Sequence, residues 1–216
     1  SDLILSIGSR LSVRQVGYNV KNWAREAYVI MVDIDREELK KPSIHVELPV
    51  HADAKDFLAR LRNALAETRI PVNSGWNAVC AAWREKYPVV TPEQCAEKPS
   101  ANLYCFINEL THRLPEGRVT VTGNGSACVA SSQAYIIRKG QRYIMNSGAA
   151  SMGYDLPAAV GACFAQGKKE TICLSGDGSI QMNLQELQTI VFHKLPIKIF
   201  IVNNQGYHSM RQTENN

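Results

Sequence analysis

The sequence predicts an α/β fold: a parallel sheet flanked by helices and preceded by part of a Rossmann-like domain. Short apolar runs rich in β-branched residues recur along the chain and predict strands. Helix-compatible segments separate these runs, an alternation typical of parallel sheets covered by helices on both faces. Two of the runs end in glycine-rich polar turns, the place where ligands of such sheets gather.

Residues 1–68 are expected to form half of a Rossmann-like domain. Apolar runs at 3–7 and 27–34 predict two strands, and the polar stretch between them is compatible with a helix. A further helix is predicted at 54–66, because four apolar side chains recur on one face of it: Phe57, Leu58, Leu61 and Leu65.

Residues 69–100 have the composition expected of a connector between domains. Proline, glycine and other turn-forming residues surround one short predicted helix, which carries Trp76, Val79 and Trp83. We expect the two tryptophans to be packing anchors, with a role as ligand platforms as the alternative.

Residues 101–216 return to a regular alternation and are predicted to form a second domain. Its expected elements are helices at 103–114, 157–166 and 184–192, and strands at 118–122, 171–175 and 197–202. No internal repeat is evident.

Charge and hydropathy exclude two classes of partner. The 24 basic and 20 acidic side chains give a formal net charge of +4 and are mixed along the chain, so no nucleic-acid partner is predicted. No apolar run reaches the roughly 18 residues needed to cross a bilayer, so no membrane role is predicted.

The cysteines are predicted to be reduced thiols. The chain has six of them, without CxxC pairs and at a density below that of small disulfide-stapled domains. Cys163 and Cys173 lie in apolar stretches, which suggests buried positions. A cytoplasmic location follows from this interpretation.

Two glycine-rich turns define the candidate site. Residues 175–179 directly follow one predicted strand and 203–206 follow the next, so both are expected at the same edge of the sheet. Gly176 and Gly178 allow the backbone amides to approach phosphate oxygens. Asp177 adds a carboxylate, which is compatible with a diphosphate only if a cation lies between them.

The cation that suits this site is Mg²⁺. It binds six oxygens at about 2.1 Å, several of them commonly from phosphates and water. The predicted protein ligands are the carboxylate of Asp177, the amide oxygen of Asn204 and the backbone carbonyl of Gly206.

These motifs resemble those of a known family. Gly-Asp-Gly-Ser at 176–179 and Asn-Asn at 203–204, with Asp177 and Asn204 27 positions apart, are similar to the thiamine-diphosphate motif. The alternative interpretation is that the two segments are two adjacent β-turns without a binding role. Ser-Met-Gly-Tyr-Asp-Leu-Pro-Ala-Ala at 151–159 further resembles acetolactate synthases and their decarboxylase relatives.

The resemblance implies a set of site residues. Met152 would hold thiamine diphosphate in the bent conformer in which the cofactor helps to remove its own C2 proton. The implied cofactor-binding residues are Gly125, Ser126, Met152, Gly176, Asp177, Gly178, Ser179, Asn204, Gly206 and Tyr207. The implied metal ligands are those named above.

The resemblance covers nearly the whole chain but has departures. Residues 1–68 are similar to the second half of the family's middle domain, whose glycine-rich half is missing. FAD is therefore not predicted for this fragment, although it is possible in the full-length protein. Acetolactate synthases usually carry Gly-Gln-His where this chain has Gly125, Ser126 and Ala127. A tryptophan of their acceptor pocket would align near Thr213. His208 and Arg211 are candidate substrate contacts, with surface roles as the alternative.

In that family a glutamate from a separate N-terminal domain, usually of a partner subunit, activates the cofactor. No such domain precedes Ser1, and the chain stops at Asn216 soon after the metal loop. We therefore expect a chain truncated at both ends that turns over no substrate alone, and a full-length protein that is a homo-oligomer, either dimer or tetramer.

Three functions compete at this point. The leading prediction is carboligation of 2-oxo acids, in which pyruvate is decarboxylated and the remaining unit is added to a second carbonyl compound. The alternative enzyme is a thiamine-dependent decarboxylase or lyase. A non-catalytic nucleotide-binding module is less favoured, because no G-x-G-x-x-G opens a helix after a first strand.

Overall fold

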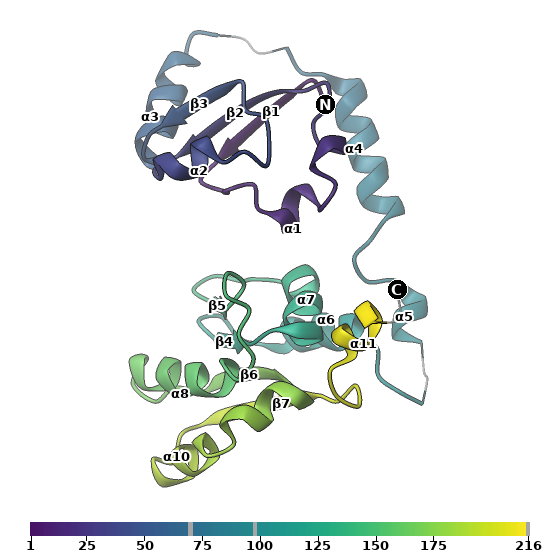
Figure 1. Ribbon diagram of the computed structural model, residues 1–216, viewed down its shortest axis with the longest axis vertical. Coiled ribbons are helices and arrows are strands. Elements are labelled where there is room, and N and C mark those ends of the chain that lie inside the picture. Colours follow the sequence, from purple (N-terminus) through teal and green to yellow (C-terminus); the bar gives the residue numbers. More distant parts are fainter. Residues whose placement is uncertain (69–70, 97–98, 215–216) are drawn as a thin grey trace. The chain divides into compact units, whose positions relative to one another are not determined.

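The computed structural model describes residues 1–68, 71–96 and 99–214, which fall into two compact units, residues 1–75 and 76–216 (Figure 1). The start of the predicted connector, 69–70, lies outside the described residues. Each unit has its own sheet, and each is described by itself.

The first unit is built on a three-stranded parallel sheet. Its strands are β1 (Leu3–Ile7), β2 (Tyr28–Asp33) and β3 (Leu48–His51), in the order β1-β2-β3. The first two match the predicted strands closely, whereas β3 was not predicted. It is short and contains a proline, Pro49, a residue that normally argues against a strand.

The predicted helix between β1 and β2 is wrong. The segment holds only α1 (Val13–Val16) and a 3₁₀ turn, η1 (Val20–Asn22). Gly17, with φ of 80°, ends α1 after a single turn. The connection is therefore mostly irregular, although Val16 and Leu11 still pack on the buried side chains of β2.

Side-chain caps define where the other helices of this unit begin. The Asp35 carboxylate accepts a hydrogen bond from the Glu37 amide at the start of α2 (Arg36–Lys40). The Asp53 carboxylate accepts from two amides at the start of α3 (Ala54–Ala64), which confirms the predicted helix in this region.

Two further helices follow in the connector region, α4 (Ser74–Lys86) and α5 (Pro92–Cys95). Trp76 and Trp83 lie on α4 and contact each other edge to face, with ring centroids 5.7 Å apart. They are 40% and 52% exposed, so neither is the buried packing anchor expected from the sequence.

The second unit is a four-stranded parallel sheet in the order β5-β4-β6-β7. Its strands are β4 (Val119–Thr122), β5 (Arg142–Met145), β6 (Thr171–Gly176) and β7 (Ile197–Val202). Its longer helices are α6 (Leu103–Arg113), α7 (Gly125–Ala134), α8 (Asp155–Ala165) and α10 (Glu186–Phe192), and its short ones are α9 (Asp177–Ile180), η2 (Gln181–Asn183) and α11 (His208–Glu214).

Helices cover both faces of this sheet (Figure 1). Along β6, Ile172 and Leu174 pack in one cluster with Ile107 of α6, whereas Cys173 packs in another with Leu156 of α8. Alternate side chains of a strand point to opposite faces, so a strand with two covered faces is apolar throughout. The predicted fold class, a parallel sheet flanked by helices, is confirmed.

The strand order locates the natural ligand crevice of the unit. From the central strand β4 the chain passes to β5 on one side and then to β6 on the other. Loops that leave neighbouring strands in opposite directions open a crevice at the carboxyl end of the sheet. Here the two loops are those that begin after Thr122 and after Gly176.

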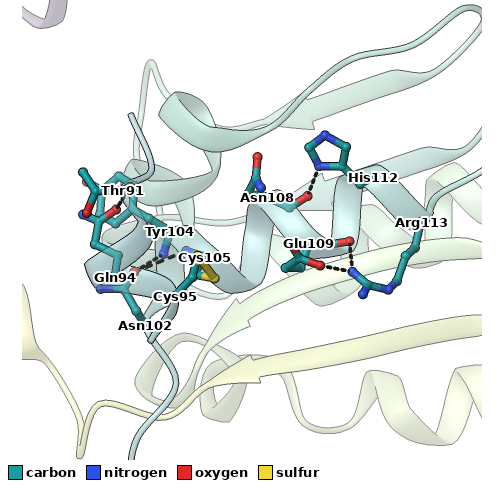
Figure 2. The surroundings of a disulfide bond; sticks show 10 residues. All are labelled: Thr91, Gln94, Cys95, Asn102, Tyr104, Cys105, Asn108, Glu109, His112 and Arg113. Carbon is teal, nitrogen blue, oxygen red and sulfur yellow. Dashed lines mark hydrogen bonds and ion pairs between the residues drawn. A yellow bond between two sulfur atoms is a disulfide. The ribbon is translucent and has the colours of Figure 1, made fainter. Parts of the chain in front are cut away.

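One prediction about the cysteines is wrong. Cys95 of α5 and Cys105 of α6 form a disulfide, with Cα atoms 5.3 Å apart (Figure 2). Asn102 caps α6 by accepting hydrogen bonds from the amides of Tyr104 and Cys105. The ten-residue spacing matches no redox or metal motif, and the thiols meet only because α5 packs near α6.

The remaining four cysteines are not disulfide-bonded. Cys163 and Cys173 are buried, as predicted, and so is Cys128, whereas Cys80 is exposed. The disulfide removes the observation on which the cytoplasmic prediction rested. Among the described helices, none is long and apolar enough to cross a membrane.

The disulfide should stabilise the second unit by restricting its unfolded chain. We expect Cys95→Ser to lower the free energy of unfolding by about 2 kcal/mol, measured by urea denaturation. Addition of reductant should produce the same loss in the wild type. Cys80→Ser, at a free and exposed thiol, is the matched control and should change nothing. Alkylation of all six cysteines in the unreduced, unfolded protein would contradict the disulfide.

Candidate functional site

Loops from the carboxyl ends of β4, β6 and β7 meet around one pocket in the second unit. Nine of the ten residues predicted to bind the cofactor line it: Gly125, Ser126, Met152, Gly176, Asp177, Gly178, Ser179, Asn204 and Tyr207. The tenth, Gly206, is joined to the pocket by a hydrogen bond to Asp177.

Asp177 links the two glycine-rich loops. It is the first residue of α9, directly after β6. Its Oδ1 accepts a hydrogen bond from the Gly178 amide at 2.9 Å, and its Oδ2 accepts one from the Gly206 amide at 2.7 Å. A carboxylate oxygen has two lone pairs, so each keeps one that can coordinate a cation.

Asn204 presents a polar atom without a partner. Its amide nitrogen donates to the Ser126 hydroxyl at 3.2 Å. Among the described residues, its Oδ1 is one of few buried side-chain oxygens that accept no hydrogen bond. A buried unsatisfied acceptor costs about 1–3 kcal/mol, a cost that a bound cation would remove.

The loop after β7 is held in an unusual backbone shape. Gln205, Gly206 and Tyr207 all have left-handed φ angles, of 63°, 75° and 47°. The Arg211 guanidinium donates to the carbonyls of Gln205 and Asn204 at 2.7 and 2.8 Å. In this structure the Arg211 side chain therefore braces the loop.

The first turn of α7 presents backbone amides to the pocket. Gly125, Ser126 and Ala127 line the pocket at the start of this ten-residue helix. The preceding Asn124, a described residue, makes no side-chain cap hydrogen bond, and its amide nitrogen donates to the carbonyl of Ala150. Uncapped amides at a helix start attract anions such as phosphate.

A turn before α8 places Met152 in the pocket wall. Gly153, with φ of 77°, donates its amide to the Ser179 hydroxyl at 2.8 Å, and its carbonyl accepts from Asn183 at 2.6 Å. A Cβ atom on Gly153 would lie 2.9 Å from the Cβ of Met182. The position of Met152 is thus determined by a tightly packed glycine on its C-terminal side.

Tyr207 and Gly178 fit closely. A Cβ atom on Gly178 would lie 3.2 to 3.5 Å from three carbons of the Tyr207 ring. The second glycine of the Gly-Asp-Gly-Ser turn therefore leaves room for an aromatic ring from the loop after β7, in addition to bringing its own backbone close to the pocket.

Neither a protein-only metal cluster nor a reactive thiol is evident nearby. In residues 1–68, 71–96 and 99–214, no three His, Cys, Asp or Glu side chains are grouped so that they could hold a metal. Burial, and secondarily the Asp155 carboxylate, raise the pKa of the Cys173 thiol to about 12, so this thiol stays neutral at physiological pH.

Sequence reasoning missed several pocket residues. Asn124, Ala127, Ser209 and Met210 also line the pocket, together with His208, which the sequence offered as a substrate contact. Asn124 and Ala127 flank predicted residues at the end of β4, so their position could have indicated them. Ser209 and Met210 lie on α11, which was not predicted, and no motif marks them.

Comparison with known proteins identifies the family to which this fold belongs. Residues 123–216 match the family model "Thiamine pyrophosphate enzyme, C-terminal TPP binding domain", and residues 1–61 match "Thiamine pyrophosphate enzyme, central domain". The chain belongs to the thiamine pyrophosphate enzymes, and the resemblance inferred from its motifs is confirmed.

Within that family the chain is similar to acetolactate synthase large subunits. It is 34% identical over 214 residues to that of Porphyra purpurea, covering 98% of this chain and 35% of the relative. It is 30% identical over 217 residues to the isozyme 1 large subunit of Escherichia coli (strain K12), covering 99% and 37%. The chain thus spans little more than a third of the length of these relatives.

The turn after β4 is sensitive to added volume. A Cβ atom on Gly123 would collide with the buried Asp155 carboxylate, whose Cγ would lie 2.9 Å away. We expect Gly123→Ala to destabilise the protein by about 1–3 kcal/mol in urea denaturation. Gly161→Ala, in the middle of α8 with open space around it, is the control and should stabilise by up to about 1 kcal/mol. Equal effects of the two substitutions would contradict the close contact.

Proposed function

We propose that this protein carries out thiamine-diphosphate- and Mg²⁺-dependent carboligation of 2-oxo acids, in the manner of acetolactate synthase. The observation that carries the proposal is the pair formed by Asp177 and Asn204 at one pocket: a carboxylate joined to the loop after β7, beside a buried amide oxygen without a partner. The names of the relatives supply the reaction class.

The residues present fit a magnesium ion. The Asp177 carboxylate, Asn204 Oδ1 and the Gly206 carbonyl are hard oxygen donors, and the unsatisfied Asn204 oxygen is the acceptor that a cation would complete. A single carboxylate is too little charge for a tight protein-only site. Diphosphate oxygens would therefore supply further ligands, so that metal and cofactor would bind together.

The diphosphate would lie against the first turn of α7. Uncapped amides of Gly125, Ser126 and Ala127 are available there, and the Ser126 hydroxyl is already oriented by the amide of Asn204. These groups would take the place of the Gly-Gln-His contacts that this chain lacks. The backbone of Gly176 and Gly178 would approach the same phosphates from the other loop.

Met152 would support the organic part of the cofactor. When bound, thiamine diphosphate supplies a carbon nucleophile that attacks 2-oxo acids and holds the electrons left when CO₂ departs. The apolar Met152 side chain would hold the two rings in the bent arrangement that this chemistry needs. A glutamate from an N-terminal domain of a second subunit would complete the site in a homo-oligomer.

The outer part of the pocket would select substrate. His208, Ser209 and Met210 line it, and Thr213 occupies the position expected for an aromatic wall of the acceptor pocket. A change of such volume alters which acceptor packs well, so the second carbonyl compound need not be pyruvate. The same feature favours a decarboxylase or lyase as the second candidate. Product analysis with pyruvate separates ligation from release of an aldehyde.

Cofactor binding tests the site directly. Calorimetric titration of thiamine diphosphate into the full-length protein should show binding only when Mg²⁺ is present. Asp177→Ala should weaken it by more than about 100-fold, because loss of a metal ligand exceeds the usual effect of outer partners. Glu116→Ala, an exposed carboxylate before β4, is the control. Binding of equal strength with chelator present would sink the proposal.

Met152 should affect turnover more than binding. We expect Met152→Ala to lower kcat by at least about tenfold while the Kd for thiamine diphosphate changes less, because the substitution removes the support for the bent conformer but leaves the diphosphate contacts. Met152→Leu keeps an apolar side chain of similar volume and should retain most activity. A Met152→Ala enzyme with unchanged kcat would show that this side chain is only part of the wall.

A further inference from the structure

We propose that Asp155 is a positioning residue whose buried carboxylate holds three cofactor-binding segments in place. The segments are the turn at 123–126, the Met152 turn at 151–154, and α9, which begins with Asp177. This inference rests on the proposed function, because it concerns how those segments are aligned to receive thiamine diphosphate and Mg²⁺.

Asp155 is a fully buried carboxylate with an unusual environment. It is the first residue of α8 and has no exposed surface. In the described part of the chain, no lysine, arginine or histidine pairs with it. A buried carboxylate without an ion pair is costly, so its hydrogen bonds and the start of the eleven-residue helix must stabilise it.

The hydrogen bonds form a chain with a fixed direction. The Gly153 amide donates to the Ser179 hydroxyl at 2.8 Å, and that hydroxyl donates to Asp155 Oδ2 at 2.8 Å. A hydroxyl has one proton, and Ser179 donates it to Asp155 while its oxygen accepts from the Gly153 amide. The Ser179 side chain is therefore occupied by this chain, and any phosphate contact by Ser179 would come from its backbone.

The same carboxylate contacts the turn at 123–126 through Gly123. A side chain at this position would collide with Asp155 Oδ2, so the turn after β4 lies directly against the carboxylate. Each of the three segments carries a residue that lines the pocket. Ser126 lies three positions after Gly123, Asp177 lies two positions before Ser179, and Met152 lies three positions before Asp155 itself. A shift of the carboxylate would therefore move three groups together: Ser126 near the diphosphate, Met152 near the cofactor rings and Asp177 at the metal.

An amide cannot replace this carboxylate. Asp155 Oδ1 accepts from the Leu156 amide at 2.9 Å, while Oδ2 accepts from Ser179, so both oxygens are acceptors. In Asp155→Asn, one of these positions becomes an NH₂ group. It would either oppose the Leu156 amide or take the place of the acceptor that orients the Ser179 hydroxyl. The isosteric variant thus removes the alignment without removing volume.

Titration of thiamine diphosphate at saturating Mg²⁺ into full-length wild type, Asp155→Asn, Ser179→Ala and the double variant tests the inference. Each single variant should raise the Kd for the cofactor by about tenfold, as loss of an outer partner does. The double variant should be little worse than either, because both act through one chain. The KM for the 2-oxo acid should stay within about twofold.

Thr171→Val is the control for stability alone. Thr171 is a buried hydroxyl at the amino end of β6, away from the pocket, with bonds to Gln166 and Lys169. The Thr171→Val substitution should lower the melting temperature and leave the Kd for thiamine diphosphate unchanged. A Kd in Asp155→Asn equal to that of the wild type, or fully additive effects in the double variant, would overturn the inference.

Two outcomes remain decisive if a variant or the function fails. If Asp155→Asn does not fold, Ser179→Ala alone decides, because wild-type affinity in that variant excludes the chain as an alignment device. If the wild type binds no thiamine diphosphate with Mg²⁺ present, the proposed function itself fails, and this inference fails with it.

Discussion

The hydrogen bond from the Gly206 amide to the Asp177 carboxylate is the constraint on which the site depends. The pairing of β6 with β7 extends to Gly176 opposite Val202, so the two loops leave the sheet side by side. The bond then joins them across the pocket at 2.7 Å. The second loop has left-handed backbone at residues 205–207, and Arg211 braces it through two carbonyls. The conformation of the two loops and the relative position of Asp177 and Gly206 are thus determined together.

The rest of the second unit acts as a rigid support for this junction. A sheet with covered faces cannot shift its strands without disturbing two clusters of packed side chains. The site loops after β4, β5, β6 and β7 all leave the same edge of that sheet. The loops themselves are connected by polar side chains, with Asn204 bonded to Ser126 and Ser179 bonded to Asp155. Binding groups on separate segments are therefore held at fixed separations before any ligand arrives.

In the proposed function, metal and diphosphate would bind this pocket jointly. Its one central carboxylate and its neutral oxygens leave coordination positions that a phosphate can fill, and the start of α7 offers amides for the same anion. Two residues that depart from the expected acetolactate synthase pattern, Ser126 and Ala127, line the pocket. In the proposed function they would contact the diphosphate, whereas Asp177 and Asn204 would hold the metal.

Local pattern determined much of this protein. The apolar runs of β1, β2, β6 and β7 and the Gly-Asp-Gly-Ser and Asn-Asn turns are visible in the sequence, because strand burial and turn chemistry act over a few residues. Only the tertiary structure decided the Cys95–Cys105 disulfide, the brace by Arg211 and the buried chain from Gly153 to Asp155. These three interactions depend on how separate segments of the chain pack together. Local sequence spacing does not predict them, because the residue types involved occur equally well on a surface or in a turn.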